Sequence, residues 1–223
     1  MLAVVVAFAT ASAGAADIAR FDTYGIRDKL LADGYPTVFG NYAEGTLACC
    51  VASAEVDVDG CELPSSPAWN QWSAVGFDDG GAFVFTVVAV GPGGGCPDGG
   101  YFAPAEFYVG GIKRSSSGPT TGSITADWVE MDGVTTGSKT IDTFDITSSY
   151  QNHLYDISDI PAVSKLTITF SASGASSASG TLRMGNYYDG SYHDFGITGQ
   201  CVPEPGTMGL LVVAAGLLLR RRR

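Results

Sequence analysis

Paired carboxylates are the residues of this sequence with the clearest scope for catalysis. Asp127 and Glu130 lie on one predicted strand, and Asp142 and Asp145 lie on another. Glycoside hydrolysis requires two carboxyl groups about 5–10 Å apart on facing surfaces. An offset of three residues places the members of each pair on opposite faces of a strand. Neither pair is therefore expected to act as an acid and base.

Nucleophilic catalysis also has little support in the sequence. His153 and His193 are the only histidines, and the Gly-x-Ser-x-Gly motif is absent. A serine or cysteine nucleophile needs a neighbouring base that activates it. The glycine-rich residues 91–100 follow a strand as a phosphate-binding loop would, but they lack its lysine, so a hairpin or surface loop is expected. We expect no catalytic activity; a secreted glycan hydrolase with an unrecognised site is an alternative.

Two binding sites are weaker candidates. Asp57 and Asp59 precede Gly60 and offer hard oxygen ligands for a structural Ca²⁺ ion, although solvated turn residues have the same pattern. Tyr187, Tyr188 and Tyr192 surround an Asp-Gly turn and are the candidate sugar-binding platform. Aromatic side chains also favour strands for packing reasons alone, so a purely structural role competes with sugar binding. No other cofactor is expected.

Five cysteines indicate disulfide bonding in an exported chain: Cys49, Cys50, Cys61, Cys96 and Cys201. An odd number leaves one thiol or an intermolecular bond. Because neighbouring residues of a strand point to opposite faces, Cys49 and Cys50 should have different partners. We expect Cys61 to pair with one of them, and Cys96 to pair with Cys201 or to stay free. Without a Cys-x-x-Cys pair, a zinc site is not expected.

The last residues of the chain have three parts. Pro203 and Pro205 flank Glu204 and predict an extended, exposed linker. An uncharged run follows over residues 208–219, and Arg220, Arg221, Arg222 and Arg223 end the chain. Twelve helical residues span roughly 18 Å, less than the roughly 30 Å hydrocarbon core of a membrane. The arginines are expected on the cytoplasmic side and the rest of the chain outside. The predicted membrane helix includes Met208, Leu210, Leu211, Val212, Val213, Leu217, Leu218 and Leu219.

This order of parts, over residues 202–223, resembles the PEP-CTERM sorting signal of exported bacterial proteins. The resemblance implies that Pro203, Glu204 and Pro205 are the recognition motif of exosortase, a membrane-embedded transpeptidase-like enzyme of bacteria that make extracellular polysaccharide. It implies that the helix and arginines hold the protein at the inner membrane until processing. A plain membrane anchor is the alternative. Many proteins with such a tail resemble β-jelly rolls whose last strand carries aromatic residues, aspartate and glycine, as residues 192–199 do here.

Residues 1–16 form an apolar run that closes on small residues, as a signal peptide does. No basic residue precedes the run, so we expect the true start of the chain to lie upstream, with a weak signal as the other explanation. A buried N-terminal strand is the alternative. Between signal and tail, residues 17–201 are expected to form one domain. Residues 17–202 hold eight of the 12 basic side chains and 22 of the 23 acidic ones, a net charge of −14. This charge excludes a nucleic-acid partner.

The hydrophobic pattern of the domain has a period of two. Residues 165–171 place Leu166, Ile168 and Phe170 on one face, and residues 82–90 are apolar enough for a strand buried on both faces. Residues 21–33 are the one predicted helix. Further strands are expected over residues 47–58, 101–112, 124–131, 141–146, 181–188 and 192–198. Glycine-rich turns separate them, which indicates a mainly β fold, a single antiparallel, jelly-roll-like β-sandwich.

Together these features predict an exported, non-catalytic protein of the cell envelope or the extracellular matrix, sorted through its C-terminal tail. The alternative function is a carbohydrate-binding module acting on exopolysaccharide. The expected partners of the protein are exosortase, the membrane before processing and, under the alternative function, exopolysaccharide.

Overall fold

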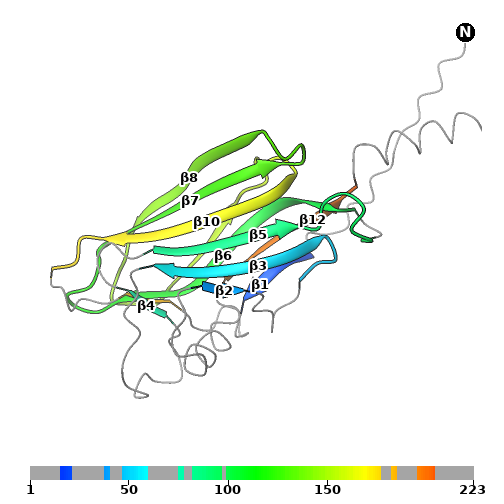
Figure 1. Cartoon of the computed structure of the whole chain (residues 1–223). Coiled ribbons are helices and arrows are strands. Elements are labelled where there is room, and N and C mark those ends of the chain that lie inside the picture. Colours follow the sequence, from blue (N-terminus) through cyan, green and yellow to red (C-terminus); the bar gives the residue numbers. More distant parts are fainter. Residues whose placement is uncertain are drawn as a thin grey trace, which may run out of the picture.

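The chain folds into an antiparallel β-sandwich, seen in a computed structural model (Figure 1). The structure describes residues 16–21, 38–40, 47–59, 75–77, 82–96, 99–176, 182–184 and 195–203. Twelve strands lie within these ranges. They are β1 (Ala16–Phe21), β2 (Val38–Gly40), β3 (Val51–Asp59), β4 (Val75–Phe77), β5 (Ala82–Ala89), β6 (Tyr101–Arg114), β7 (Thr121–Glu130), β8 (Thr136–Asp145), β9 (Gln151–Asp156), β10 (Val163–Ser173), β11 (Leu182–Met184) and β12 (Phe195–Val202).

The strands form two layers. Sheet 1 has the order β2-β3-β5-β10-β7-β8, and sheet 2 has the order β1-β12-β6-β9, with β11 and β4 extending from the far end of β6. One residue pair, Val163 with Phe102, is the only ladder link between β10 and β6. The two layers therefore face each other across a shared core.

Strict alternation of side chains explains how sheet 1 covers this core. Along β5, Phe83, Phe85 and Val87 are buried, and the residues between them are half-buried. Along β10, Leu166, Ile168 and Phe170 are buried, as the sequence predicted. Sheet 2 contributes its own row of buried residues, among them Phe107, Val109, Ile112 and Ile197. Because the outward-facing residues of β5 are only half-buried, the prediction of a strand buried on both faces is wrong.

The final strand lies inside sheet 2, not at its edge. β12 pairs with β1 on one side and with β6 on the other. Gly199 is buried at the β6 side, where a Cβ atom would overlap the backbone of Ala103 and Pro104, so only glycine permits this close approach. β12 is consequently fixed by hydrogen bonds on both sides as far as Gly199, and by pairing with β6 alone over residues 200–202.

Several boundaries differ from the sequence prediction. β8 begins at Thr136 and not at residue 141, and β9 was not predicted. The predicted helix over residues 21–33 lies outside the described residues, except for Phe21, which ends β1. The predicted signal peptide and membrane helix also lie outside them, apart from Ala16 at the start of β1. In the part of the chain that the structure describes, no helix is long and apolar enough to cross a membrane.

Candidate functional sites

Two disulfide bonds join the end of β12 to the loops around it. Cys49 is bonded to Cys96, with Cα atoms 5.4 Å apart, and Cys50 is bonded to Cys201, with Cα atoms 5.7 Å apart. The expected pairings of Cys61 with Cys49 or Cys50, and of Cys96 with Cys201, are therefore wrong. The expectation that Cys49 and Cys50 have different partners is confirmed. Cys61 itself lies outside the described residues.

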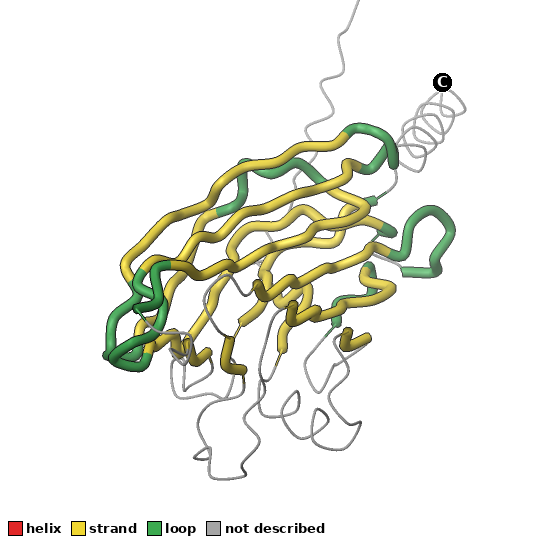
Figure 2. The backbone as a smooth tube through the Cα atoms, turned by 60° about the vertical axis from the view of Figure 1, so that its left-hand side comes forward, coloured by secondary structure: helices red, strands yellow, loops and turns green. Residues whose placement is uncertain are grey.

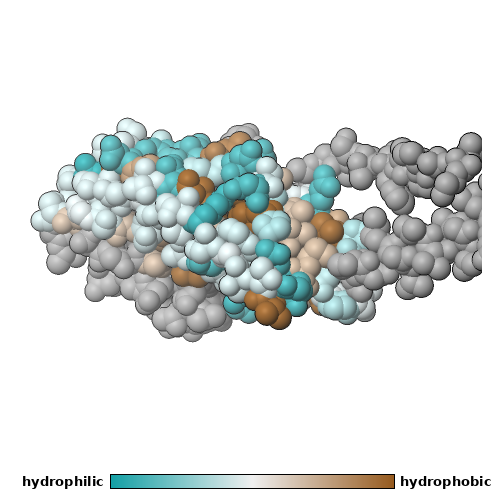
Figure 3. Space-filling view, turned by 90° about the horizontal axis from the view of Figure 1, so that it is seen from above, coloured by the Kyte–Doolittle hydropathy of each residue, from teal (hydrophilic) through white to brown (hydrophobic). Residues whose placement is uncertain are grey.

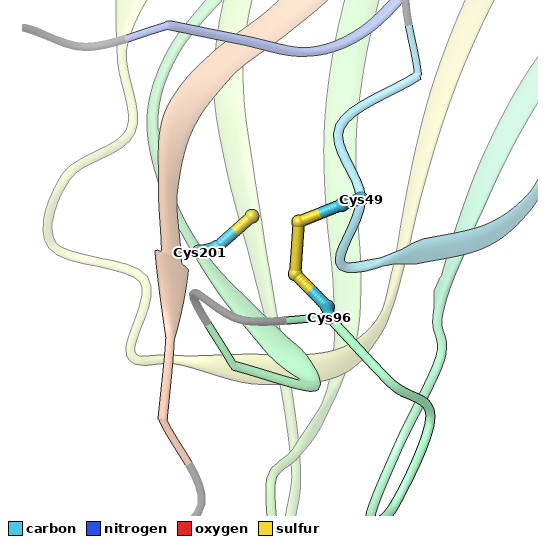
Figure 4. Close-up of side chains that lie close together, drawn as sticks. All are labelled: Cys49, Cys96 and Cys201. Carbon is cyan, nitrogen blue, oxygen red and sulfur yellow. A yellow bond between two sulfur atoms is a disulfide. The ribbon is translucent and has the colours of Figure 1, made fainter.

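Figure 4 shows the sulfur atom of Cys201 directed toward the Cys49–Cys96 bond. The Sγ atoms of these three cysteines lie within 4.8 Å of one another, a spacing that resembles a metal site. Cys201 is bonded to Cys50, which the figure does not draw. Metal binding requires free thiolates, whereas all of these sulfur atoms are in disulfides. The cluster therefore acts as a pair of covalent crosslinks.

The loop before β6, described at residues 90–96, 99 and 100, completes this arrangement. It leads from β5 in sheet 1 to β6 in sheet 2, and Gly91 donates a backbone hydrogen bond to Gly100. Gly99 has a φ of 114°, and a Cβ atom there would overlap the backbone of Val202 and Pro203. We call the described loop residues 90–96, 99 and 100, together with the two disulfides, the clasp. The clasp contacts the chain at the first two residues of the tail.

A second cluster consists of the aromatic side chains of Phe144 on β8 and of His153 and Tyr155 on β9. The rings of Phe144 and His153 have centroids 4.2 Å apart, and His153 stacks on Tyr155 at 5.8 Å. Phe144 also stacks on Phe170 of the core. His153 Nε2 is buried and has no hydrogen-bond partner within the described residues. Tyr155 Oη is also buried and lies close to the Asp142 carboxylate. Because these atoms have no exposed surface, they cannot reach a substrate, and the cluster serves packing.

Burial shifts the pKa of both polar rings, those of His153 and Tyr155. Desolvation lowers the pKa of His153, although the nearby Asp142 carboxylate opposes this effect. Desolvation, together with Asp142, raises the pKa of Tyr155. Both changes favour the neutral form, as expected for titratable groups in an apolar environment. His153 is therefore an uncharged part of the core at neutral pH.

We predict that acid weakens the fold through His153. The unfolded chain binds a proton below about pH 6.5, whereas folded His153 binds it only at lower pH, so the unfolded state holds more protons in between. The contribution of His153 to the free energy of unfolding is fully present above pH 6.5. As the pH decreases below this value, His153 lowers the free energy of unfolding by at most about 1.4 kcal/mol per pH unit. Urea titrations between pH 7 and pH 5 measure this slope.

His153→Phe keeps the ring stacking and removes the titration, so its slope over the same pH range should be smaller than that of the unmodified protein. Equal slopes would show that other groups cause the acid sensitivity. Hydrogen bonds from Ser158 lower the pKa of the exposed Asp156, so this carboxylate should not contribute to the slope between pH 7 and pH 5. Its contribution is lost only when the carboxylate becomes protonated, below its ordinary value of 3.8.

The outer face of sheet 1 carries a shallow hollow of about 420 Å³. Two rows of paired residues form it: Ser138, Asp127 and Thr167 in one row, and Thr136, Val129 and Lys165 in the other. The Thr167 row continues to Thr86, whose hydroxyl lies 3.3 Å from that of Thr167. In Figure 3, the described surface seen from above is mainly hydrophilic or neutral, with separate hydrophobic spots. The hollow thus offers hydroxyl groups, one carboxylate and one ammonium group.

The structure leaves most of the site residues predicted from sequence untested. Tyr187, Tyr188 and Tyr192 lie outside the described residues, as do Glu204, Pro205 and the rest of the tail. Asp57 and Asp59 lie on β3, and their side chains are not described. The hollow was not predicted, because its residues come from three strands whose register is not visible in the sequence.

Comparison with known proteins identifies the C-terminal segment. Residues 202–223 match the sequence profile described as the PEP-CTERM protein-sorting motif. The tail is a PEP-CTERM sorting motif. Such a motif marks an exported protein, and here it begins at Val202, the last residue of β12. A comparison with curated proteins finds no match.

Among solved structures, the chain is similar to carbohydrate-binding modules at low sequence identity. The CBM22-1-CBM22-2 tandem domain of Xyn10C from Paenibacillus barcinonensis has 11% identity and a TM-score of 0.45, and the similarity covers 88% of this chain but only 48% of that one. The CBM22-1 xylan-binding domain of the same protein has 14% identity and a TM-score of 0.38, covering 67% and 83%. A family 29 carbohydrate-binding module has 11% identity and a TM-score of 0.34, covering 74% and 86%. The sandwich fold of this chain is established by its own strand pairings.

Proposed function

We propose that this protein is a non-catalytic component of the cell envelope or extracellular matrix, processed by exosortase at its C-terminal tail. One observation carries the proposal: the PEP-CTERM motif begins at the last residue of a central strand of a folded domain. The domain is acidic, and the cluster of Phe144, His153 and Tyr155 serves packing. These properties suit a protein that is delivered to the cell surface for a structural or adhesive role.

Replacing Pro203, Glu204 and Pro205 with alanine tests this proposal. In a host that contains exosortase, the parent protein should be shortened and should leave the inner membrane. The alanine variant should keep its full length and remain in the membrane fraction. Pulse-chase labelling followed by gel electrophoresis and fractionation measures both properties. Unchanged processing of the variant would contradict the proposal.

Carbohydrate binding is the second candidate function, and the hollow on sheet 1 favours it. Its hydroxyl groups and the Asp127 carboxylate can exchange hydrogen bonds with sugar hydroxyl groups. Asp127 is the one carboxylate among the described lining residues, whereas glycoside hydrolysis requires two. The hollow therefore supports binding better than hydrolysis.

Asp127→Ala should weaken polysaccharide binding about tenfold or more, because it removes a hydrogen bond to a charged group. Affinity electrophoresis in gels that contain soluble bacterial and plant polysaccharides gives the measurement. Ser123→Ala is the control, because Ser123 lies on the same face of β7 but does not line the hollow. If no polysaccharide retards the protein, or if both variants bind as the parent does, the hollow is not the binding site.

A further inference from the structure

The sorting motif joins the folded domain without a flexible spacer. Val202 still pairs with Tyr101 in the β12–β6 ladder, and Cys201 is covalently bonded to the buried Cys50. Gly99 packs against the backbone of Val202 and Pro203. Pro203, the first residue beyond the ladder, is exposed. The motif therefore begins at the surface of the domain.

Several loops lie at the same end of the sandwich as this exit. One row of paired residues crosses both sheets through Cys201, Phe102, Val163 and Glu130. The clasp precedes Phe102, and the turn at residues 131–135 follows Glu130. Figure 2 shows both connections as loops at one end of the molecule. We call this end, formed by the clasp, the 131–135 turn and Pro203, the exit end.

The exit end presents exposed uncharged residues next to one exposed carboxylate, that of Asp132. Residues 92–95 are exposed and carry no charge, and Val134 at the tip of the turn is 81% exposed. Exposed uncharged residues beside a processing signal suit contact with another protein, because they lose little hydration when they are covered. β1 also starts at this end, because Ala16 pairs with Gly199.

We propose that the exit end is the surface of the domain that contacts the sorting enzyme during processing. The inference rests on the proposed function, because it requires that an enzyme acts on the motif. Three extended residues span at most about 11 Å, so an active site that grips residues 203–205 lies within that distance of the domain surface. The β12 ladder and the Cys50–Cys201 bond hold the residues before Pro203 in the domain, so these residues cannot extend the reach of the motif. The protein around the active site must therefore touch the exit end.

Charged substitutions at the exit end test this contact in the full-length protein. Val134→Asp and Pro92→Asp should each slow processing about fivefold to tenfold, because a charge would lose its hydration at the interface. Val134→Lys should slow processing as well. Leu154→Asp is the matched control: Leu154 is also exposed, at 53%, but it lies on β9 and pairs with Tyr108 in the middle of β6. This control should be processed at the parent rate.

A linker gives the second arm of the experiment. Five residues of sequence Gly-Ser-Gly-Ser-Gly, inserted between Val202 and Pro203, add up to about 17 Å of reach. With this linker, Val134→Asp should be processed within about twofold of the linker protein without the substitution, because the domain no longer has to touch the enzyme. Pulse-chase labelling measures the rates, and thermal unfolding checks that every variant is folded.

Three results would overturn the inference. The first is parent-like processing of Val134→Asp and Pro92→Asp without the linker. The second is an equal loss of rate with and without the linker. The third is faster processing of Val134→Lys, which would identify an anionic lipid surface as the contact. If the parent itself is not processed, the proposed function fails and the inference fails with it, whereas a processed parent with insensitive variants rejects the inference alone.

Discussion

Replacing both Cys50 and Cys201 with alanine should lower the free energy of unfolding by about 5 kcal/mol. The bond closes a loop of 151 residues. In the chain-entropy description, a disulfide stabilises the fold by restricting the unfolded chain, and the effect increases with loop length. Cys50 is also fully buried, so the substitution removes packed atoms. Urea denaturation monitored by tryptophan fluorescence gives the free energy of unfolding.

The Cys49–Cys96 bond provides the matched control. It closes a loop of only 47 residues, and Cys49 is exposed. Its removal by Cys49→Ala and Cys96→Ala should cost about 4 kcal/mol, roughly 1 kcal/mol less than removal of the longer loop. If the shorter loop costs as much as the longer one, or more, loop length does not determine how the two bonds stabilise this domain.

Phe85→Ala should destabilise the domain by about 4 kcal/mol. Phe85 is fully buried on the inner face of β5, at the centre of sheet 1, and it pairs with Ile168 of β10. Truncation of such a ring removes its transfer free energy and leaves a cavity that the surrounding strands fill only in part. The midpoint of thermal unfolding should fall by roughly 8–16 °C for a domain of this size.

The neighbouring residue on the same strand gives the control for this prediction. Val84 points to the outer face of sheet 1 and is half-buried. Val84→Ala should therefore cost about 1 kcal/mol, well below the cost of Phe85→Ala. Similar losses for the two variants would mean that the outer face of β5 is covered as completely as the inner face, against the burial pattern described above.

The sequence predicted those strands whose inward residues are apolar. Leu166, Ile168 and Phe170 alternate with polar residues, and this pattern located β10 within two residues at each end. By contrast, β9 was missed because its inward residues are Gln151, His153 and Tyr155, which do not form an apolar stripe. β9 forms because β6 supplies its hydrogen bonds, and β6 is distant in sequence.

Contacts between distant segments were not accessible from local patterns. The first five residues of β8 contain no large apolar side chain, so the predicted strand started too late. Their pairing is determined by the turn that follows β7. The disulfide pairing was wrong because proximity in sequence favoured Cys61, whereas the clasp brings Cys96 and Cys201 next to Cys49 and Cys50. The sorting motif was predicted correctly because it is a contiguous segment recognised by order and composition.

The central position of β12 has a consequence for the timing of export. A chain that leaves the cytoplasm from its N-terminus delivers β12 after every other strand of the domain. Until β12 arrives, β1 and β6 lack the strand that lies between them, and Cys50 lacks its partner. Sheet 2 can therefore be completed only when the residues directly before the sorting motif have crossed the membrane. Completion of the fold and arrival of the sorting motif are coupled by their order along the chain.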